Sequence, residues 1–93
     1  MQKRLGVAGI VIEDTVVVPT VNAILHDFAE IIVGRMGIPY RSRGVSIVSV
    51  ILDGSTDDIS ALTGQLGRLP GVSVKTALTR EAASAPVAPE KEA

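Results

Sequence analysis

The sequence predicts an α+β fold in which four strands and two helices follow one another in the order βαββαβ. Two segments, Leu5 to Ile12 and Val45 to Leu52, are apolar on both of their alternating faces, which is typical of strands at the centre of a sheet. Two other segments repeat apolar residues at steps of three and four, as amphipathic helices do. Glycine, proline and acidic residues separate these segments and indicate where each element ends.

The two central segments each carry two apolar sets of side chains. In the first segment the sets that point in opposite directions are Leu5, Val7 and Val11, and Ala8, Ile10 and Ile12. In the second segment they are Val45, Ile47 and Ile51, and Val48, Val50 and Leu52. Because exposure of apolar side chains to water is unfavourable, both strands are expected to be buried on both of their faces.

The first helix is predicted between these two strands. Pro19 is tolerated in its first turn, and the helix is expected to end near Gly34. The residues of its apolar stripe are Val21, Ile24, Leu25, Phe28, Ile31 and Ile32. After it, residues 35–40 are expected to form a short edge strand, because Pro39 cannot donate a hydrogen bond to a neighbouring strand.

The second half of the chain repeats the alternation. Asp53 and Gly54 are expected to end the strand that begins at Val45, and residues 55–58 offer a cap and early acidic charge for the second helix. The apolar stripe of that helix is Ile59, Leu62, Leu66 and Leu69. Pro70-Gly71 stops it, and residues 72–78 alternate as a last strand with one apolar face.

This order, with right-handed crossovers, gives a four-stranded antiparallel sheet with both helices on one face, the ferredoxin-like plait. Its central strands are the first and third, which are the two that are apolar on both faces. One face of the sheet is therefore expected to be buried by another copy of the chain, in a homodimer or homotetramer. The domain is predicted to span residues 1–80, and residues 81–93, rich in Ala, Pro, Glu, Lys and Ser, to form a disordered tail.

Composition excludes several classes of protein. A net charge of −1 gives no long-range attraction to nucleic acid, and the aromatic residues are only Phe28 and Tyr40, too few for a base-stacking platform. The chain has no cysteine, so thiolate metal sites and disulfides are excluded. No apolar run approaches the ~18 residues of a membrane helix, and no export signal is recognised. We expect a cytoplasmic protein that contacts neither membrane nor nucleic acid directly.

Five pieces of the sequence, residues 25–28, 35–40, 45–48, 61–67 and 71–75, resemble the iron-only hydrogenase system regulators, and the resemblance covers about residues 4–79. That family is similar in fold to ACT domains and to the C-terminal domain of nickel-responsive regulators. The resemblance implies oligomers built through sheets, a small-molecule sensing role and a link to transcription. Nickel sites of the related regulators use several histidines and a cysteine, whereas this chain has only His26, so neither nickel nor any other cofactor is expected.

The candidate ligand-binding residues fall into three groups. Arg35, Tyr40 and Arg41, with Arg43 beside them, flank the edge strand and could converge on an anion in an oligomer, although solvated turn charges are the simpler interpretation. Asp14 lies in the turn where ACT domains often bind effectors, although a helix cap explains it equally well.

Gly64 and Gly67 form the third group. They interrupt the second helix at a cost of about 0.8–1 kcal/mol each, which indicates either a close contact or room for a ligand. His26 and Glu30, four residues apart on the first helix, are weak metal candidates, because two ligands rarely suffice for a closed site.

The sequence therefore favours a non-enzymatic regulatory or small-molecule-sensing domain that acts as a homo-oligomer. A structural interaction module without a small-molecule ligand is the alternative. An enzyme with a shared site built from several subunits is the least favoured hypothesis, because the sequence shows no nucleophile with a base.

Overall fold

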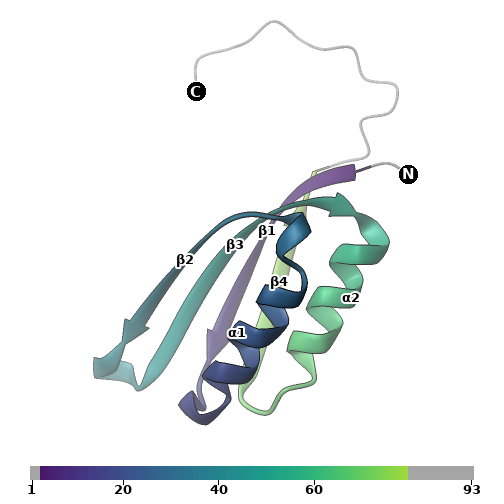
Figure 1. The fold of residues 1–93 in the computed structure, drawn as a ribbon. Coiled ribbons are helices and arrows are strands. Elements are labelled where there is room, and N and C mark those ends of the chain that lie inside the picture. The colour runs from purple at the N-terminus through teal and green to yellow at the C-terminus, as the bar shows by residue number, and fades with distance from the viewer. Residues whose placement is uncertain (1–2, 80–93) are drawn as a thin grey trace, which may run out of the picture.

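The computed structural model describes residues 3–79 of the 93-residue chain, and their elements follow the predicted order (Figure 1). The strands are β1 (Lys3–Ile12), β2 (Ile32–Tyr40), β3 (Val45–Ser55) and β4 (Val72–Leu78), and the helices are α1 (Val18–Asp27) and α2 (Thr56–Gly67). Three single 3₁₀ turns lie at Thr15–Val17, Ala29–Ile31 and Arg41–Arg43. The expected tail, residues 81–93, lies outside the described residues.

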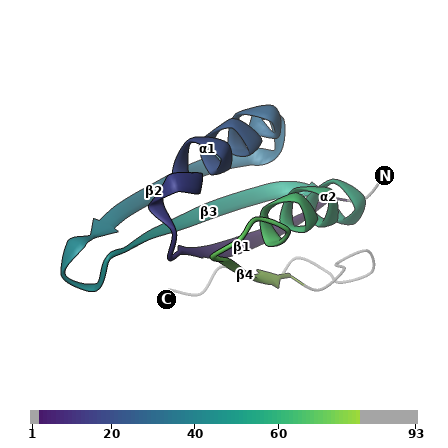
Figure 2. The same cartoon turned by 90° about the horizontal axis from the view of Figure 1, so that it is seen from below.

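The four strands form one antiparallel sheet in the order β2-β3-β1-β4. Both helices lie on the same side of this sheet, α1 toward β2 and β3 and α2 toward β1 and β4 (Figure 2). This arrangement confirms the predicted ferredoxin-like α+β plait, with β1 and β3 at its centre. We call the side that carries the helices the inner face and the opposite side the outer face.

The hydrophobic core fills the space between the inner face and the helices. The inner sets of the two central strands are buried, as the alternation predicts, and α2 buries three of the four residues of its predicted stripe. The buried core residues are Ala8, Ile10, Ile12, Val21, Leu25, Val48, Val50, Leu52, Ile59, Leu62 and Leu66. Leu69, the fourth stripe residue, is only partly buried against this core.

Two side-chain caps begin the helical segments. The Ser55 Oγ accepts a hydrogen bond of 3.1 Å from the Asp58 backbone N–H, and this satisfies one of the free donors at the start of α2. Asp14 does the same for the 3₁₀ turn before α1, where its Oδ1 accepts from the Val16 N–H at 3.1 Å. Capping is thus a role that the structure assigns to both residues.

The predicted end of the first helix was wrong. The helix ends at Asp27 rather than near Gly34, so Ile31 lies in a 3₁₀ turn and Ile32 opens β2. The spacing of Ile31 and Ile32 from Phe28 matches a helix. However, Ile31, Ile32 and Val33 are all β-branched, and such a run favours extended backbone. Strand β2 is therefore longer than the expected 35–40, with a bulge between Ile32 and Gly34, although it is an edge strand as predicted.

The predicted end of the third strand was also wrong. Asp53 and Gly54 do not stop β3, which continues to Ser55 and pairs with the start of β1. Gly54 is buried because the Ile31 side chain occupies the place of its missing Cβ, with Ile31 Cγ2 2.8 Å from that position. The glycine here allows close packing within a strand, and the Asp-Gly pair does not form a turn.

Gly71 holds the turn between α2 and β4 against the turn after β1. Its φ is +73°, and a Cβ built on it would lie 2.9 Å from Asp14 Cβ. Its carbonyl accepts a 2.7 Å hydrogen bond from the Glu13 N–H. A side chain at this position therefore meets both an unfavourable backbone conformation and a steric clash.

We expect Gly71→Ala to lower the free energy of unfolding by roughly 1–3 kcal/mol, because of this strain and contact. Gly64→Ala is the matched control. It lies in α2 with no atom within 4 Å of a new Cβ, and it should raise the free energy of unfolding by up to about 1 kcal/mol. Urea unfolding at one fixed protein concentration measures both changes. Equal effects of the two substitutions would contradict this assignment.

Candidate functional site

The outer face of the sheet is an apolar surface that no part of residues 3–79 covers. Ile47 and Ile51 are 41% and 48% exposed in the middle of β3, while the intervening Val48 and Val50 are at 6% or less. The same alternation exposes Leu5 and Val7 on β1. The exposed large apolar residues of this face are Leu5, Val7, Met36, Ile38, Tyr40, Ile47 and Ile51, and Val11 and Val45 beside them are half-buried. The prediction of a bare hydrophobic sheet surface is confirmed.

The outer face is not uniform along its strands. Gly9 of β1 pairs with Ser49 of β3, and these two small residues make a shallow furrow over the two central strands, which Met36 on β2 and Lys75 on β4 close at its ends. On one side of the furrow Val11 pairs with Ile47, and on the other side Val7 pairs with Ile51. Two branched apolar ridges therefore flank a furrow that has almost no side chain.

Charges lie at the two ends of β3 on this surface. Asp53 pairs with Leu5 near the C-terminal end of the strand. The turn before its N-terminal end holds Arg41 and Arg43, both exposed. The sequence has no acidic residue between Glu30 and Asp53, so the β2–β3 hairpin is the basic end of the sheet.

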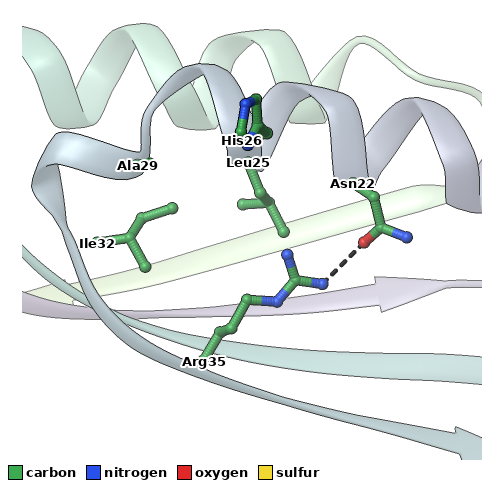
Figure 3. Close-up of a pocket in the computed structure, with 6 residues that line it drawn as sticks. All are labelled: Asn22, Leu25, His26, Ala29, Ile32 and Arg35. Carbon is green, nitrogen blue, oxygen red and sulfur yellow. Dashed lines mark hydrogen bonds between the residues drawn. The ribbon is translucent and has the colours of Figure 1, made fainter.

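A hollow of about 350 Å³ lies on the other side of the sheet, between α1 and β2 (Figure 3). We call it the Arg35 hollow, and the residues that line it are Asn22, Leu25, His26, Ala29, Ile32 and Arg35. Leu25 points from the helix toward the Arg35 guanidinium on the strand, and His26 lies on the helix above them (Figure 3). Its volume lies in the range of sites for small organic ligands.

Asn22 holds the Arg35 guanidinium in place. The Arg35 Nη2 donates a hydrogen bond of 2.7 Å to the Asn22 Oδ1. Among residues 3–79, Asn22 is the hydrogen-bond partner of the Arg35 side chain. One edge of the guanidinium fork is thus fixed, while the remaining N–H donors are available to a planar anion. Asn22 and Arg35 also border a second hollow of about 250 Å³ toward Pro39 and Ser46, so the pair stands between the two hollows.

The structure does not bring the predicted ligand-binding residues together within one chain. Arg35 pairs with buried Val50 and faces the helices, whereas Tyr40 pairs with Val45 on the outer face. Arg41 lies in the hairpin turn. Residues an odd number of positions apart on a strand point to opposite faces, which separates Arg35 from Tyr40.

The remaining predicted ligand-binding residues lie elsewhere. Asp14 is beside Gly71, at the turn that joins α2 to β4. Gly64 and Gly67 are exposed on α2, where an added Cβ would meet no atom within 4 Å. Neither glycine therefore allows a close contact with another part of residues 3–79.

The weak metal candidates also lie on different elements. His26 is in the last turn of α1, and Glu30 is in the 3₁₀ turn that follows. Within residues 3–79 no group of three or more His, Cys, Asp and Glu side chains is placed to hold a metal ion. Across the same residues, no helix has the length and apolar character needed to cross a membrane.

Sequence reasoning missed Asn22 as a partner of Arg35. The two lie on different elements and are thirteen positions apart, so no local spacing joins them. One signal was available, because Asn22 is the polar residue that directly follows Val21, the first buried residue of α1. A polar residue there borders the core and can reach the neighbouring strand.

A family model described as "TM1266-like: Iron-only hydrogenase system regulator, putative" matches residues 4–76. Among solved structures, an uncharacterized protein, TM1266 from Thermotoga maritima, shares 36% identity with a TM-score of 0.81, over 85% of this chain and all of that one. An unknown protein from Galdieria sulphuraria shares 16% identity with a TM-score of 0.58, over 95% of this chain and 49% of that one, and is similar in fold. No curated protein matches the chain.

Proposed function

This chain belongs to the TM1266-like family, described as regulators of the iron-only hydrogenase system, and we propose that it is a non-enzymatic regulatory domain that senses a small molecule as a homo-oligomer. The observation that carries the proposal is the uncovered apolar outer face. In a domain of this size, a surface of seven exposed large apolar side chains on neighbouring strands is typical of an interface. A link to transcription rests on the family description and on the fold relatives that it resembles.

A second copy is the occupant that we propose for this face. The centre of the face is apolar, and its charged residues lie at its margins, namely at the two ends of β3 and at Lys75 on the edge strand β4, as in interfaces between identical subunits. A closed dimer uses the same patch on both subunits, so a single exposed face suffices to build it. Association would also add buried apolar area to a chain whose own core is small.

The Arg35 hollow is the site that we propose for the small molecule. A guanidinium that one side chain fixes, and that no carboxylate among residues 3–79 neutralises, favours a carboxylate or another planar anion. Leu25, Ala29 and Ile32 supply apolar wall for an aliphatic part of the ligand. The ligand class that fits is a small aliphatic carboxylate.

We expect the purified chain to be a dimer or tetramer at micromolar concentration, with a mass that resists 0.5 M NaCl, because the interface is apolar. Ile47→Asp should weaken association on the order of 100-fold, since it places an unpaired charge in the interface centre. Multi-angle light scattering measures both masses.

Val16→Asp is the matched control for this substitution. Val16 is 81% exposed and lies in a turn outside the sheet, so its replacement should leave the mass unchanged. A monomeric wild-type chain would overturn the proposed homo-oligomer and indicate that a different protein covers the face.

We expect short branched carboxylates such as isovalerate to raise the melting temperature of the wild-type chain. Arg35→Gln should weaken binding by about 10–100-fold through loss of the charge-assisted hydrogen bonds. Arg68→Gln, at the exposed end of α2, is the charge-matched control and should bind normally. Thermal shift and isothermal titration calorimetry measure this.

If no carboxylate in such a series binds, or if the Arg35 variant binds as well as the wild type, the sensing role of the hollow fails. The structural interaction module without a ligand then becomes the better account of the chain. This outcome is independent of the oligomer measurement.

A further inference from the structure

We infer that the second copy lies on the outer face with its strands antiparallel to those of the first, about a two-fold axis that crosses β3 at Val48. The inference rests on the proposed homo-oligomer and specifies which residues meet in it. The axis lies in the interface and is perpendicular to the strands. A β3 residue on one side of Val48 therefore faces, in the other copy, the β3 residue that is the same number of positions away on the opposite side of Val48. The register of the sheet then fixes the meeting positions on the neighbouring strands.

Large residues meet small ones at the centre of this arrangement, and farther out Ile51 meets Val45. On β3, Ile47 of each copy enters the place beside Ser49 of the other. On β1, where Ile10 pairs with Val48, Val11 likewise meets Gly9. The ridge of each copy therefore fills the furrow of its partner.

Strand β2 shows the same complementarity. Gly37 pairs with Val48, so the axis crosses β2 at Gly37. Tyr40, the largest exposed side chain of the face, then meets Gly34, and Ile38 meets Met36. The contact of Tyr40 with Gly34 on β2 therefore supports the same axis as the contacts on β1 and β3. The β2 sequence differs from those of β1 and β3, so this support is independent.

The charges at the two ends of β3 become partners across the interface. Arg43, in the turn before β3, and Asp53 are each five positions from Val48 along the sequence, so the hairpin turn of each copy comes over the end of β3 that holds Asp53 in the other. Packed sheets lie ~10 Å apart, and a relative rotation of ~30° shifts strand ends sideways, distances that a long arginine side chain spans. Arg41 in the same turn lies beside this contact.

Other axes across the strands give poorer contacts. An axis at Ser49 lays furrow on furrow, with Gly9 against Gly9, and leaves a void, while it sets Asp53 against Val45. An axis at Val50 fills the furrow with the ridge formed by Val7 and Ile51. However, it sets the Asp53 carboxylate against Ile47 of the other copy. The axis at Val48 is the one of these three that pairs Asp53 with a cation.

An axis along the strands also gives a poorer contact. Over β3, such an axis lays β3 on β3 in the same direction, so that Asp53 meets Asp53 and like charges oppose each other. Between β1 and β3, it lays β3 on β1, so that Ile47 meets Val11 and Ser49 meets Gly9, ridge on ridge and furrow on furrow. Charge and steric fit together therefore favour a second copy in the antiparallel arrangement.

A mixing experiment tests the Arg43–Asp53 contact. Arg43→Asp and Asp53→Arg should each weaken self-association at least about tenfold, because each homodimer then holds two like-charge contacts. An equimolar mixture of the two variants restores opposite charges at both contacts, so it should form a heterodimer within about threefold of the wild-type affinity. Sedimentation equilibrium at 50 mM NaCl, with one variant fluorescently labelled, measures the dissociation constants of the wild type, of each variant and of their mixture.

Arg68→Asp, an exposed charge reversal at the end of α2, is the control and should leave the dissociation constant unchanged. If the wild type self-associates but mixing restores nothing, the proposed axis is overturned and the homo-oligomer stands. A wild-type monomer overturns the homo-oligomer itself. Circular dichroism of each variant separates a lost contact from a lost fold.

Discussion

The pairing of β1 with β3 is the constraint on which the rest of the structure depends. Ten positions pair without interruption, from Lys3 with Ser55 to Ile12 with Ser46. Because both strands alternate apolar residues on both faces, one ladder fixes two surfaces at once. The inner surface forms the core with the two helices, and the outer surface remains exposed. A shift of β3 by one residue would exchange its two faces and leave the helices over Ile47 and Ile51.

Much of this fold was predictable because its signals are local. The central strands follow from alternation, and α2 follows from its stripe and the Ser55 cap. The segment around Ile31 was not predictable, since its apolar spacing suits a helix while its β-branched residues suit a strand. Gly54 was misread for a different reason, because only the packed structure shows that the Ile31 side chain takes the place of its Cβ.

The candidate site was less predictable than the fold. Arg35 was a candidate anion-binding residue from sequence, beside the simpler interpretation of a solvated charge, and the structure sets it in a hollow beside α1. Its supposed companions, Tyr40 and Arg41, lie on the other face and in the turn, because alternation along β2 separates them. The Asn22 contact depends on how α1 lies over the sheet. Such a contact between elements is a property of tertiary structure and has no signature in local sequence.

Strand β2 connects the proposed interface and the proposed ligand site. Its inward residues Arg35 and Gly37 border the two hollows, while its outward residues Ile38 and Tyr40 belong to the outer face. It is also an edge strand that pairs with β3 alone and contains the bulge of the sheet. Coupling between the proposed ligand site and the proposed interface needs a structural connection between them. Strand β2 provides one, since it contributes residues to both and is held by a neighbouring strand on one side only.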